Sequence, residues 1–228
     1  MLNIGARLTC AALMVNPHRK TVDIGTDHAY IPAYLVLNGM SESVLACDIG
    51  VKPLENAAAT LKEYSLEDKI TLRISDGLKE VSEDEAEEII ICGMGGTLMS
   101  EILSAAEWIK KDGIHLVLQP MTHSEDVRRF LCANGFRISK EKYVIESGRA
   151  YCLISADYDG VIRDEEEGFY YFGRLPKNDE ASLTYMFRQL HRVNTKLLAL
   201  KKSGTEPQQV EILSQVYDYY KRGMNSVC

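Results

Sequence analysis

The stretch that decides the fold runs from Val22 to Pro32 and reads VDIGTDHAYIP. Around Asp23, the residues Thr21, Val22 and Ile24 are β-branched and mostly apolar, and the segment has the length of a short, buried parallel strand. Gly25 follows this strand, and a glycine there lets the backbone approach a ligand closely. The turn then leads into a helix whose N-terminus would face that ligand. The stretch therefore predicts an α/β fold with a ligand-binding loop after its first strand.

The same loop favours a cationic cofactor over a dinucleotide. A dinucleotide loop has the pattern G-x-G-x-x-G, in which glycines and a helix N-terminus bind the pyrophosphate. Here Gly25 is the only glycine, and Asp27 and Tyr30 occupy the second and third glycine positions. A carboxylate at Asp27 would repel a diphosphate, whereas it tolerates a sulfonium. S-adenosylmethionine therefore fits this loop better than NAD.

Asp48 is the second feature that indicates a nucleotide-binding unit. Residues 43–48, which read SVLACD, predict another apolar strand that ends in this acid. The acid stands about 20 residues beyond Gly25, where a carboxylate binds the ribose hydroxyls in nucleotide-binding α/β units. The alternative is that Asp48 only caps the helix that begins near Pro53.

Three further strands are predicted to end in small or polar residues. Residues 70–77 (ITLRISDG) end in a segment that either contacts an adenine ring or forms a plain β-turn. Residues 88–92 (EIIIC) form the fourth strand, which runs into GMGG at residues 93–96, and these glycines admit either a flat group or a tight strand-to-helix crossing. Residues 115–118 (HLVL) form the fifth strand, which ends at residues 119–121 (QPM). The carboxyl ends of parallel strands share one edge of the sheet, where such folds bind ligands.

These motifs together resemble one family of enzymes. The chain resembles the bacterial tRNA methyltransferases that modify N1 of the adenine at position 22. The matching segments keep the family's order over most of the first 160 residues: Arg7–Leu8, Asp23–Pro32 (DIGTDHAYIP), Ile74–Leu78 (ISDGL), Cys92–Gly96 (CGMGG) and Leu118–Met121 (LQPM). Cys92 stands where an alanine is usual in the family, and we expect that difference to change only packing.

The resemblance implies a fold, a cofactor and a partner. The expected fold class is α/β, with a Rossmann-like class I methyltransferase sheet in residues 1–160. Residues 161–228 would form a linker and an all-α, coiled-coil-like helical hairpin. The implied activity is methyl transfer from S-adenosyl-L-methionine to N1 of adenine 22 in tRNA, without a metal. Positions at the strand ends are assigned to cofactor binding: Asp23, Gly25, Thr26, Asp48, Ile49, Ser75, Asp76, Gly77, Gly93 and Met94.

Three residues of the cofactor loop are candidates for catalysis. N1 lies on the Watson–Crick edge, so the adenine must be unpaired or flipped out before it reacts. Methylation leaves a positive charge on the ring, and Asp27 is expected to stabilise that charge or to accept a proton. His28 could support Asp27 or contact RNA, although a lone histidine at such a turn is often a helix cap. Tyr30 could stack on the adenine, or it could be buried in the following helix.

The substrate side of the site is assigned to residues on neighbouring elements. Many enzymes that methylate an exocyclic amine carry an Asn or Asp followed by Pro-Pro and an aromatic residue, and this chain has GMGG there instead. A ring nitrogen already presents a lone pair and needs no such clamp. Gln119 is expected to read the base edge, and Arg7 to contact phosphate or to lie on the surface. The substrate-binding candidates in this domain are Arg7, Gly95, Gly96, Gln119 and Pro120.

The C-terminal part predicts a hairpin, a linker and two helices. Residues 142–146 and 151–157 flank a turn, and the acidic residues 157–168 read as a linker. Apolar residues then recur at helical spacing, first at Leu183, Phe187, Leu190, Leu197 and Leu200, and after Pro207 at Val210, Leu213, Tyr217 and Tyr220. Arg188, Arg192 and Lys196 form a stripe on the first helix, which either follows an RNA backbone or is a solvated face; the resemblance favours RNA.

Charge and composition limit the possible functions. The net charge of the chain is −7, but the segment from Arg174 onward contains nine Lys and Arg and only five acids. This basic C-terminal segment could bind a polyanion, although the rest of the chain is acidic. The six cysteines never form C-x-x-C and are expected to be reduced core thiols. Without a long apolar run or a signal peptide, the protein is expected to be cytoplasmic. Two other classes stay open: a methyltransferase for a small metabolite, and a non-catalytic RNA-binding module.

Overall fold

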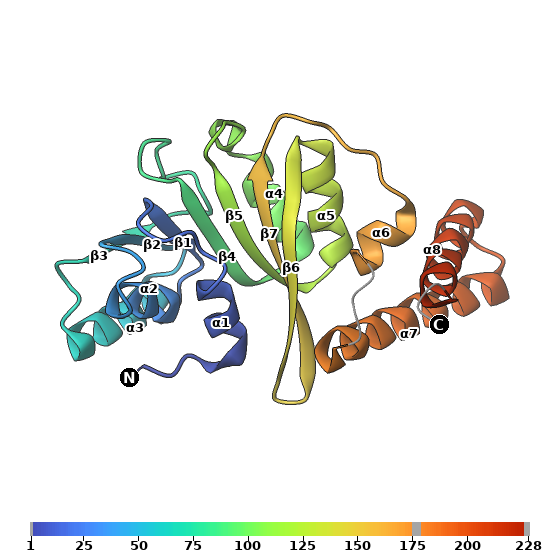
Figure 1. Cartoon of the computed structure of the whole chain (residues 1–228), viewed down its shortest axis with the longest axis horizontal. Coiled ribbons are helices and arrows are strands. Elements are labelled where there is room, and N and C mark those ends of the chain that lie inside the picture. The colour runs from blue at the N-terminus through green and yellow to red at the C-terminus, as the bar shows by residue number, and fades with distance from the viewer. Residues whose placement is uncertain (1, 175–178, 226–228) are drawn as a thin grey trace.

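The computed structural model describes residues 2–174 and 179–225 of the chain. Its centre is one seven-stranded sheet in the order β3-β2-β1-β4-β5-β7-β6, in which β7 runs antiparallel to both of its neighbours (Figure 1). The strands are β1 Thr21–Ile24, β2 Val44–Asp48, β3 Ile70–Ile74, β4 Glu88–Gly95, β5 His115–Thr122, β6 Phe136–Glu146 and β7 Arg149–Tyr158. The five predicted parallel strands and the final hairpin are therefore confirmed.

Helices cover both faces of the sheet (Figure 1). On one face lie α1 Gly5–Ala12, α2 Tyr30–Leu37 and α3 Val51–Tyr64, and on the other lie α4 Gly96–Ser104 and α5 Ser124–Ala133, with the short η1 Glu107–Ile109 nearby. The side chains of β4 alternate between two apolar cores, since Ile89 and Ile91 pack with α4 and α5 while Ile90 packs with α1, α2 and α3. Burial on both faces explains why the parallel strands are continuous apolar runs.

Strands β4, β5, β6 and β7 are all longer than the sequence predicts. β6 begins at Phe136 rather than at residue 142, because residues 137–142 (RISKEK) are mostly polar and belong to an edge strand that pairs only with β7. β4 continues to Gly95 rather than stopping at Cys92, and pairs with Thr122 of β5 after two shifts of register. The glycines at the end of β4 therefore belong to the sheet.

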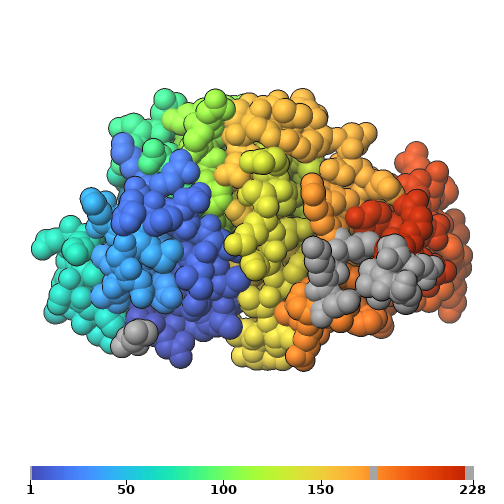
Figure 2. Space-filling model, viewed as in Figure 1, coloured from blue at the N-terminus to red at the C-terminus, as the bar shows by residue number. Residues whose placement is uncertain are grey.

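The hairpin of β6 and β7 reaches across to the N-terminal segment. Its two-residue turn is Ser147-Gly148, both with positive φ (+50° and +72°), as a type I′ turn requires. On the face that Figure 2 shows, the hairpin borders the N-terminal segment, and α1 packs against β6. This contact brings residues far apart in the sequence to the carboxyl edge of the sheet.

The C-terminal part contains one helix more than the sequence predicts. The short α6 Glu167–Phe172 lies where a linker is expected, and it buries Phe169, Tyr170 and Phe172. The two predicted helices are confirmed as α7 Glu180–Ser203 and α8 Pro207–Asn225, which share an apolar cluster made by Phe172, Met186, Val193, Leu197, Leu213, Val216 and Tyr220. In the part of the chain that the structure describes, no helix is long and apolar enough to cross a membrane.

The α7 helix is fixed to the sheet domain through polar contacts with α5. The hydroxyl groups of Ser124 and Tyr185 lie 2.6 Å apart, and both are buried. Arg128, which is fully buried, donates to Glu141 on β6 at 2.7 Å and to the carbonyl of Tyr170 at 2.9 Å. Removing any of these partners would leave a buried polar group unsatisfied, so they hold the helices at one position relative to the sheet.

Candidate active site

The predicted cofactor loop is a tight turn at the end of β1. Gly25 has φ +76°, and both Asp27 (φ +47°) and Ala29 (φ +53°) are left-handed. The backbone N–H groups of Gly25 and Thr26 donate to the carbonyl of Cys47 on β2, at 2.8 and 3.0 Å. Non-glycine residues in this region are strained, and strain of this kind is found at ligand-binding turns. The sequence therefore folds into a loop that is pinned to the neighbouring strand.

A cavity of about 460 Å³ opens above this loop. It brings together ten of the predicted site residues with three others that line it: Arg7, Leu8, Asp23, Gly25, Thr26, Asp27, His28, Tyr30, Ile31, Asp48, Cys92, Gly93 and Met94. Its size lies in the range of pockets that hold small organic ligands. Its position, at the carboxyl ends of β1, β2 and β4, is where open α/β sheets bind their cofactors.

Asp48 lies at the end of β2 with its carboxylate held on both sides. One oxygen accepts from the N–H of Gly50 at 2.9 Å, and the other accepts from the N–H of Asp27 at 3.4 Å. Gly50 is the N-cap of α3, so the first of these bonds lies at the start of that helix, as the capping alternative predicts. Capping is not the only contact of Asp48, because its other oxygen binds the loop after β1 and the residue lines the cavity.

Asp23 is a buried acid in the wall of the cavity. Only 4% of the residue is exposed, and this burial raises the pKa of its carboxyl group from 3.8 to about 7. The hydroxyl of Thr26 lies close enough to oppose that rise, yet it makes no hydrogen bond of normal geometry with any described residue. A carboxylate that lacks solvation and a hydroxyl that lacks a partner are what a bound ammonium group would satisfy. These residues thus fit the amino-acid end of S-adenosylmethionine.

The three predicted catalytic residues lie together at the mouth of the cavity. The side chain of Asp27 is 61% exposed, and one of its oxygens lies 3.7 Å from Nε2 of His28. Asn56 on α3 donates to the other oxygen at 3.5 Å. The rings of His28 and Tyr30 are stacked, with centroids 5.1 Å apart and planes 9° apart. Tyr30 is 38% exposed at the start of α2, so the alternative that it is buried in the helix is wrong.

Arg7 is held in the wall of the cavity by three other elements. Its guanidinium donates to Oε1 of Gln119 at 2.5 Å, lies 3.6 Å from Oε2 of Glu146, and stands 5.6 Å from the ring centroid of Tyr151. The alternative of a plain surface position is therefore wrong. Sequence reasoning missed Glu146 and Tyr151, because no local pattern shows that the hairpin reaches α1.

Gln119 is fully buried, which differs from its predicted role as a reader of the base edge. Its side-chain oxygen accepts from Arg7, and its amide nitrogen donates to the carbonyl of Pro120 at 3.0 Å. Both ends of the amide are thus already bonded, so Gln119 positions Arg7 rather than presenting free groups to a substrate. Pro120 does not line the cavity beside the cofactor loop, but lies in a second cavity next to it.

The glycines after β4 have different physical roles. Gly93 has φ +84° and borders the cavity, where the nearest atom to an added methyl group would be Nη1 of Arg7 at 3.8 Å. At Gly96 such a methyl group would lie 2.0 Å from the carbonyl oxygen of His123. Gly96 is buried at a tight crossing of two backbones, so its predicted contact with substrate is wrong. Met94 reaches back over the cofactor loop, with Cε against Gly25.

The segment after β3 lies beside the cavity without lining it. The N–H of Ser75 donates to the carbonyl of Asp48 at 2.9 Å, and its hydroxyl donates to the carbonyl of Gly77 at 2.7 Å. Asp76 pairs with Lys79 at 2.5 Å. The geometry is that of the predicted alternative, a turn closed by its own hydrogen bonds. Contact of this turn, and of the 68% exposed Ile49, with an adenine ring stays a prediction.

The predicted basic stripe on α7 is interrupted at its centre. Arg192 pairs with Glu125 of α5 at 2.8 Å, so its charge is compensated within the protein. Arg188 and Lys196 are exposed and stay candidates for RNA contact. The acid that neutralises Arg192 stands 67 residues earlier in the chain, so helical spacing could not reveal this pair. The prediction that Arg192 offers a free charge to RNA is therefore wrong.

The sequence and the fold both match known methyltransferases. Residues 4–154 match the family model described as a methyltransferase domain. The tRNA (adenine(22)-N(1))-methyltransferase of Bacillus subtilis (strain 168) is 32% identical over 167 residues, which cover 70% of each chain. The sheet, the cavity at its carboxyl edge and the family match define a Rossmann-like methyltransferase.

Solved structures show the same fold over 95% or more of the chain. The Bacillus subtilis m1A22 tRNA methyltransferase TrmK superposes with a TM-score of 0.84 at 24% identity, covering 100% of both chains, and shows the same fold. The TrmK of M. capricolum in complex with S-adenosyl-homocysteine has a TM-score of 0.76 at 25% identity, covering 95% of this chain and 97% of the other. The chain belongs to the tRNA (adenine(22)-N(1))-methyltransferase family.

Proposed function

We propose that this chain transfers the methyl group of S-adenosyl-L-methionine to N1 of adenine 22 in tRNA. Membership of the family supports the reaction. The observation that carries the proposal is the position of Asp27, whose exposed carboxylate stands beside the stacked rings of His28 and Tyr30 at the mouth of the cavity. An acid next to an aromatic platform suits a flipped adenine that becomes positively charged.

The residues inside the cavity would hold the cofactor by its polar ends. Asp48 would accept hydrogen bonds from the ribose hydroxyls with the oxygen atoms that face the cavity. Asp23 and Thr26 would bind the ammonium group, since Asp23 is buried away from solvent and the Thr26 hydroxyl has no hydrogen-bond partner among the described residues. When bound, S-adenosylmethionine supplies an electrophilic methyl carbon, whose bond to sulfur breaks as adenine N1 bonds to it.

Catalysis by the protein would be a matter of position and charge. Holding N1 in line with the methyl carbon removes much of the entropic part of the barrier. Asp27 would stabilise the positive charge of the methylated adenine ring, or it would accept the proton that the ring loses from N6. His28 lies 3.7 Å from that carboxylate and would orient it, while Tyr30 would stack on the base.

The substrate surface would extend beyond the cofactor cavity. We assign residues 1–160 to the methyltransferase domain and 161–228 to a helical arm that faces tRNA with Arg188 and Lys196. Such an enzyme would work in the cytoplasm. The segment from Arg174 onward, with nine Lys and Arg against five acids, has a net charge of +4 on an otherwise acidic protein, which suits a polyanionic partner.

The test is methyl transfer from labelled S-adenosylmethionine to unmodified tRNA with adenine or guanine at position 22. Wild type should label only the adenine form, as 1-methyladenosine. Asp27→Asn should keep cofactor affinity but lose about 10²–10⁴ in kcat, the usual contribution of a general base. The matched control is Asp68→Asn, the same change at an exposed acid before β3.

Two results would contradict the proposal. Cofactor binding without transfer to either tRNA would favour an enzyme of small metabolites. Equal label in the adenine and guanine forms would show that the methylated atom lies elsewhere in the RNA. An unchanged kcat in Asp27→Asn would remove Asp27 from catalysis while leaving the substrate assignment in place.

A further inference from the structure

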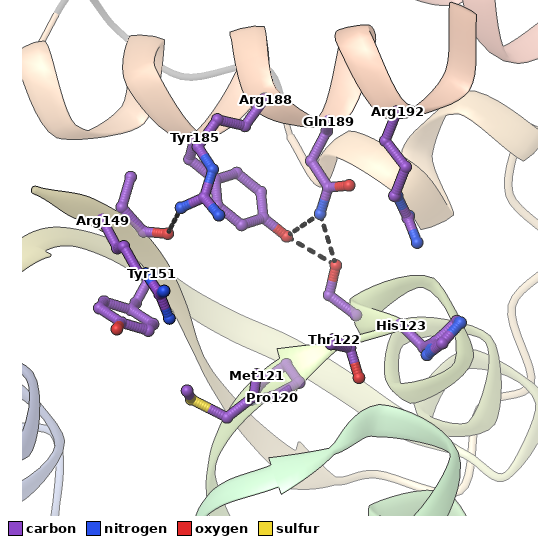
Figure 3. Close-up of a pocket in the computed structure, with 12 residues that line it drawn as sticks. Pro120, Met121, Thr122, His123, Arg149, Tyr151, Tyr185, Arg188, Gln189 and Arg192 are labelled. Atoms are coloured by element: carbon purple, nitrogen blue, oxygen red, sulfur yellow. Dashed lines mark hydrogen bonds between the residues drawn. The ribbon is translucent and has the colours of Figure 1, made fainter. Parts of the chain in front are cut away.

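Figure 3 shows a second cavity, whose volume is about 280 Å³ and whose lining residue Tyr151 lies against Arg7 of the first cavity. The walls of the second cavity come from four elements: the end of β5, the start of α5, the beginning of β7, and the face of α7 that points toward the sheet. None of its residues belongs to the cofactor-binding set. The fold therefore builds this cavity where the helical arm meets the methyltransferase sheet.

Two arginines give this cavity a positive charge. Arg149 is the first residue of β7, Arg188 lies on α7, and both side chains are exposed (Figure 3). Among the described residues no carboxylate pairs with either of them, whereas Arg192 in the same cavity pairs with Glu125. Within the described parts of the chain, the Arg188 side chain makes only one hydrogen bond, a long one of 3.4 Å to the carbonyl of Ala150. Both guanidinium groups thus keep donors for an anion.

The remaining lining offers flat and apolar surface. Met121 is 43% exposed and lies with Pro120 at the base of the cavity, while the ring of Tyr151 lies at its side (Figure 3). Aromatic rings and apolar side chains of this kind stack on nucleic-acid bases, and arginines bind the phosphates between them. The combination is typical of a site for a single unpaired nucleotide.

Tyr151 connects this cavity to the cofactor site. The guanidinium of Arg7, which lines the cofactor cavity, stands 5.6 Å from the centroid of the Tyr151 ring. Gln119 also connects the two sites, since its side chain accepts a hydrogen bond from Arg7 and the next residue, Pro120, lines the second cavity. A ligand in the second cavity would therefore be a neighbour of a base that reacts in the first.

We propose that this second cavity binds the nucleotide adjacent to the methylated adenosine, with Arg149 and Arg188 on its phosphate and with its base against Tyr151 and Met121. This inference rests on the proposed function, because it requires an RNA substrate. An adenine that leaves its stack must be held through the backbone on at least one side. A cavity of about 280 Å³ can take one nucleotide but not a duplex.

The test compares two double variants of the full chain. Arg149→Gln with Arg188→Gln removes the two charges of the cavity that no described carboxylate pairs with. Lys62→Gln with Lys69→Gln removes two exposed charges near the end of α3, at the opposite end of the molecule (Figure 1). Each protein is titrated with tRNA at several salt concentrations, and its affinity for S-adenosylmethionine is measured separately.

The arginine variant should bind tRNA about ten- to a hundredfold more weakly, as expected when charge-assisted hydrogen bonds are removed. Its plot of log Kd against log salt should become shallower by about one for each phosphate that the protein no longer neutralises. Affinity for S-adenosylmethionine should not change, and the lysine variant should bind tRNA like wild type.

The outcomes separate this inference from the proposed function. If wild type methylates adenine 22 and the arginine variant binds tRNA normally, the second cavity is not an RNA site although the function stands. Equal weakening in both double variants would show only a diffuse effect of net charge and would overturn the inference. If no methyl transfer occurs but only the arginine variant loses tRNA binding, the cavity is an RNA site in a protein with another activity.

Discussion

Replacing Asp23 by asparagine should stabilise the ligand-free protein at neutral and alkaline pH. The pKa of the Asp23 carboxyl is raised from 3.8 to about 7 by burial. Between these two values the native protein holds a proton that the unfolded chain has released, so stability falls as the pH rises through this window and is constant above it. A difference of about three pKa units corresponds to about 4 kcal/mol, which is the upper limit of the gain from asparagine.

Thermal unfolding of both proteins between pH 4 and pH 9 measures this effect. The Tm values of the two proteins should be close at pH 4, the difference between them should grow up to pH 7, and it should stay constant at higher pH. For a chain of this length each 1 kcal/mol moves Tm by about 2–4 °C, and the burial of the asparagine amide will reduce the gain. Asp68→Asn, at an exposed position, is the control and should leave Tm unchanged at every pH.

Cofactor binding gives the second half of the prediction. A bound ammonium group requires the ionised form of Asp23, so the affinity of wild type for S-adenosylmethionine should fall up to about tenfold for each pH unit below 7. Asp23→Asn should bind weakly at all pH values. The reasoning would be refuted by an affinity of wild type that is constant from pH 5.5 to 8.5 together with equal unfolding curves for the two proteins.

Two substitutions test the packing that positions the site. Gly96→Ala should lower the free energy of unfolding by about 1–3 kcal/mol, because its methyl group would lie 2.0 Å from the carbonyl oxygen of His123. Gly95→Ala is the control and should cost less, because its methyl group meets only a side-chain oxygen at 3.3 Å. Urea unfolding compares the two variants, and an equal loss would contradict the argument that two backbones cross tightly at Gly96. Arg192→Gln leaves the buried Glu125 unpaired and should therefore lower the free energy of unfolding. The expected loss is only about 1–2 kcal/mol, because the Arg192 side chain is 40% exposed to solvent. Adding Glu125→Gln should restore part of that stability in the same assay, and a strictly additive loss would exclude the pair.

The sequence predicts the cofactor half of the site because its signals are local. Gly25 and Asp48 each follow an apolar run, and Asp23 lies within the last residues of β1. Parallel strands bring their carboxyl ends together wherever the chain folds into such a sheet. The structure confirms that these residues line one cavity. The positions of the five parallel strands follow from the same runs, since strands buried on both faces leave a continuous apolar pattern.

The substrate half could not be predicted in the same way. The partners of Arg7 come from the end of β5 and from the β6–β7 hairpin, more than 110 residues along the chain. Single polar residues such as Glu146 carry no periodic signal, and Gln119 reads equally well as a free or a buried amide. The short α6 was missed because only six residues form it, at the end of an acidic segment. Its three buried aromatic side chains were the available signal.

Arg7 explains why the two halves belong to one site. Its guanidinium lines the cofactor cavity, and Gln119, Glu146 and Tyr151 hold it there from β5, β6 and β7. The same Tyr151 forms a wall of the second cavity, between the sheet and α7. A shift of the hairpin or of α7 on RNA binding would therefore reach the cofactor cavity through one cation–ring contact and one ion pair. Arg7 belongs to α1, so the N-terminal helix also lines the cavity, although most of the other polar residues of the cavity come from the ends of strands and the loops after them.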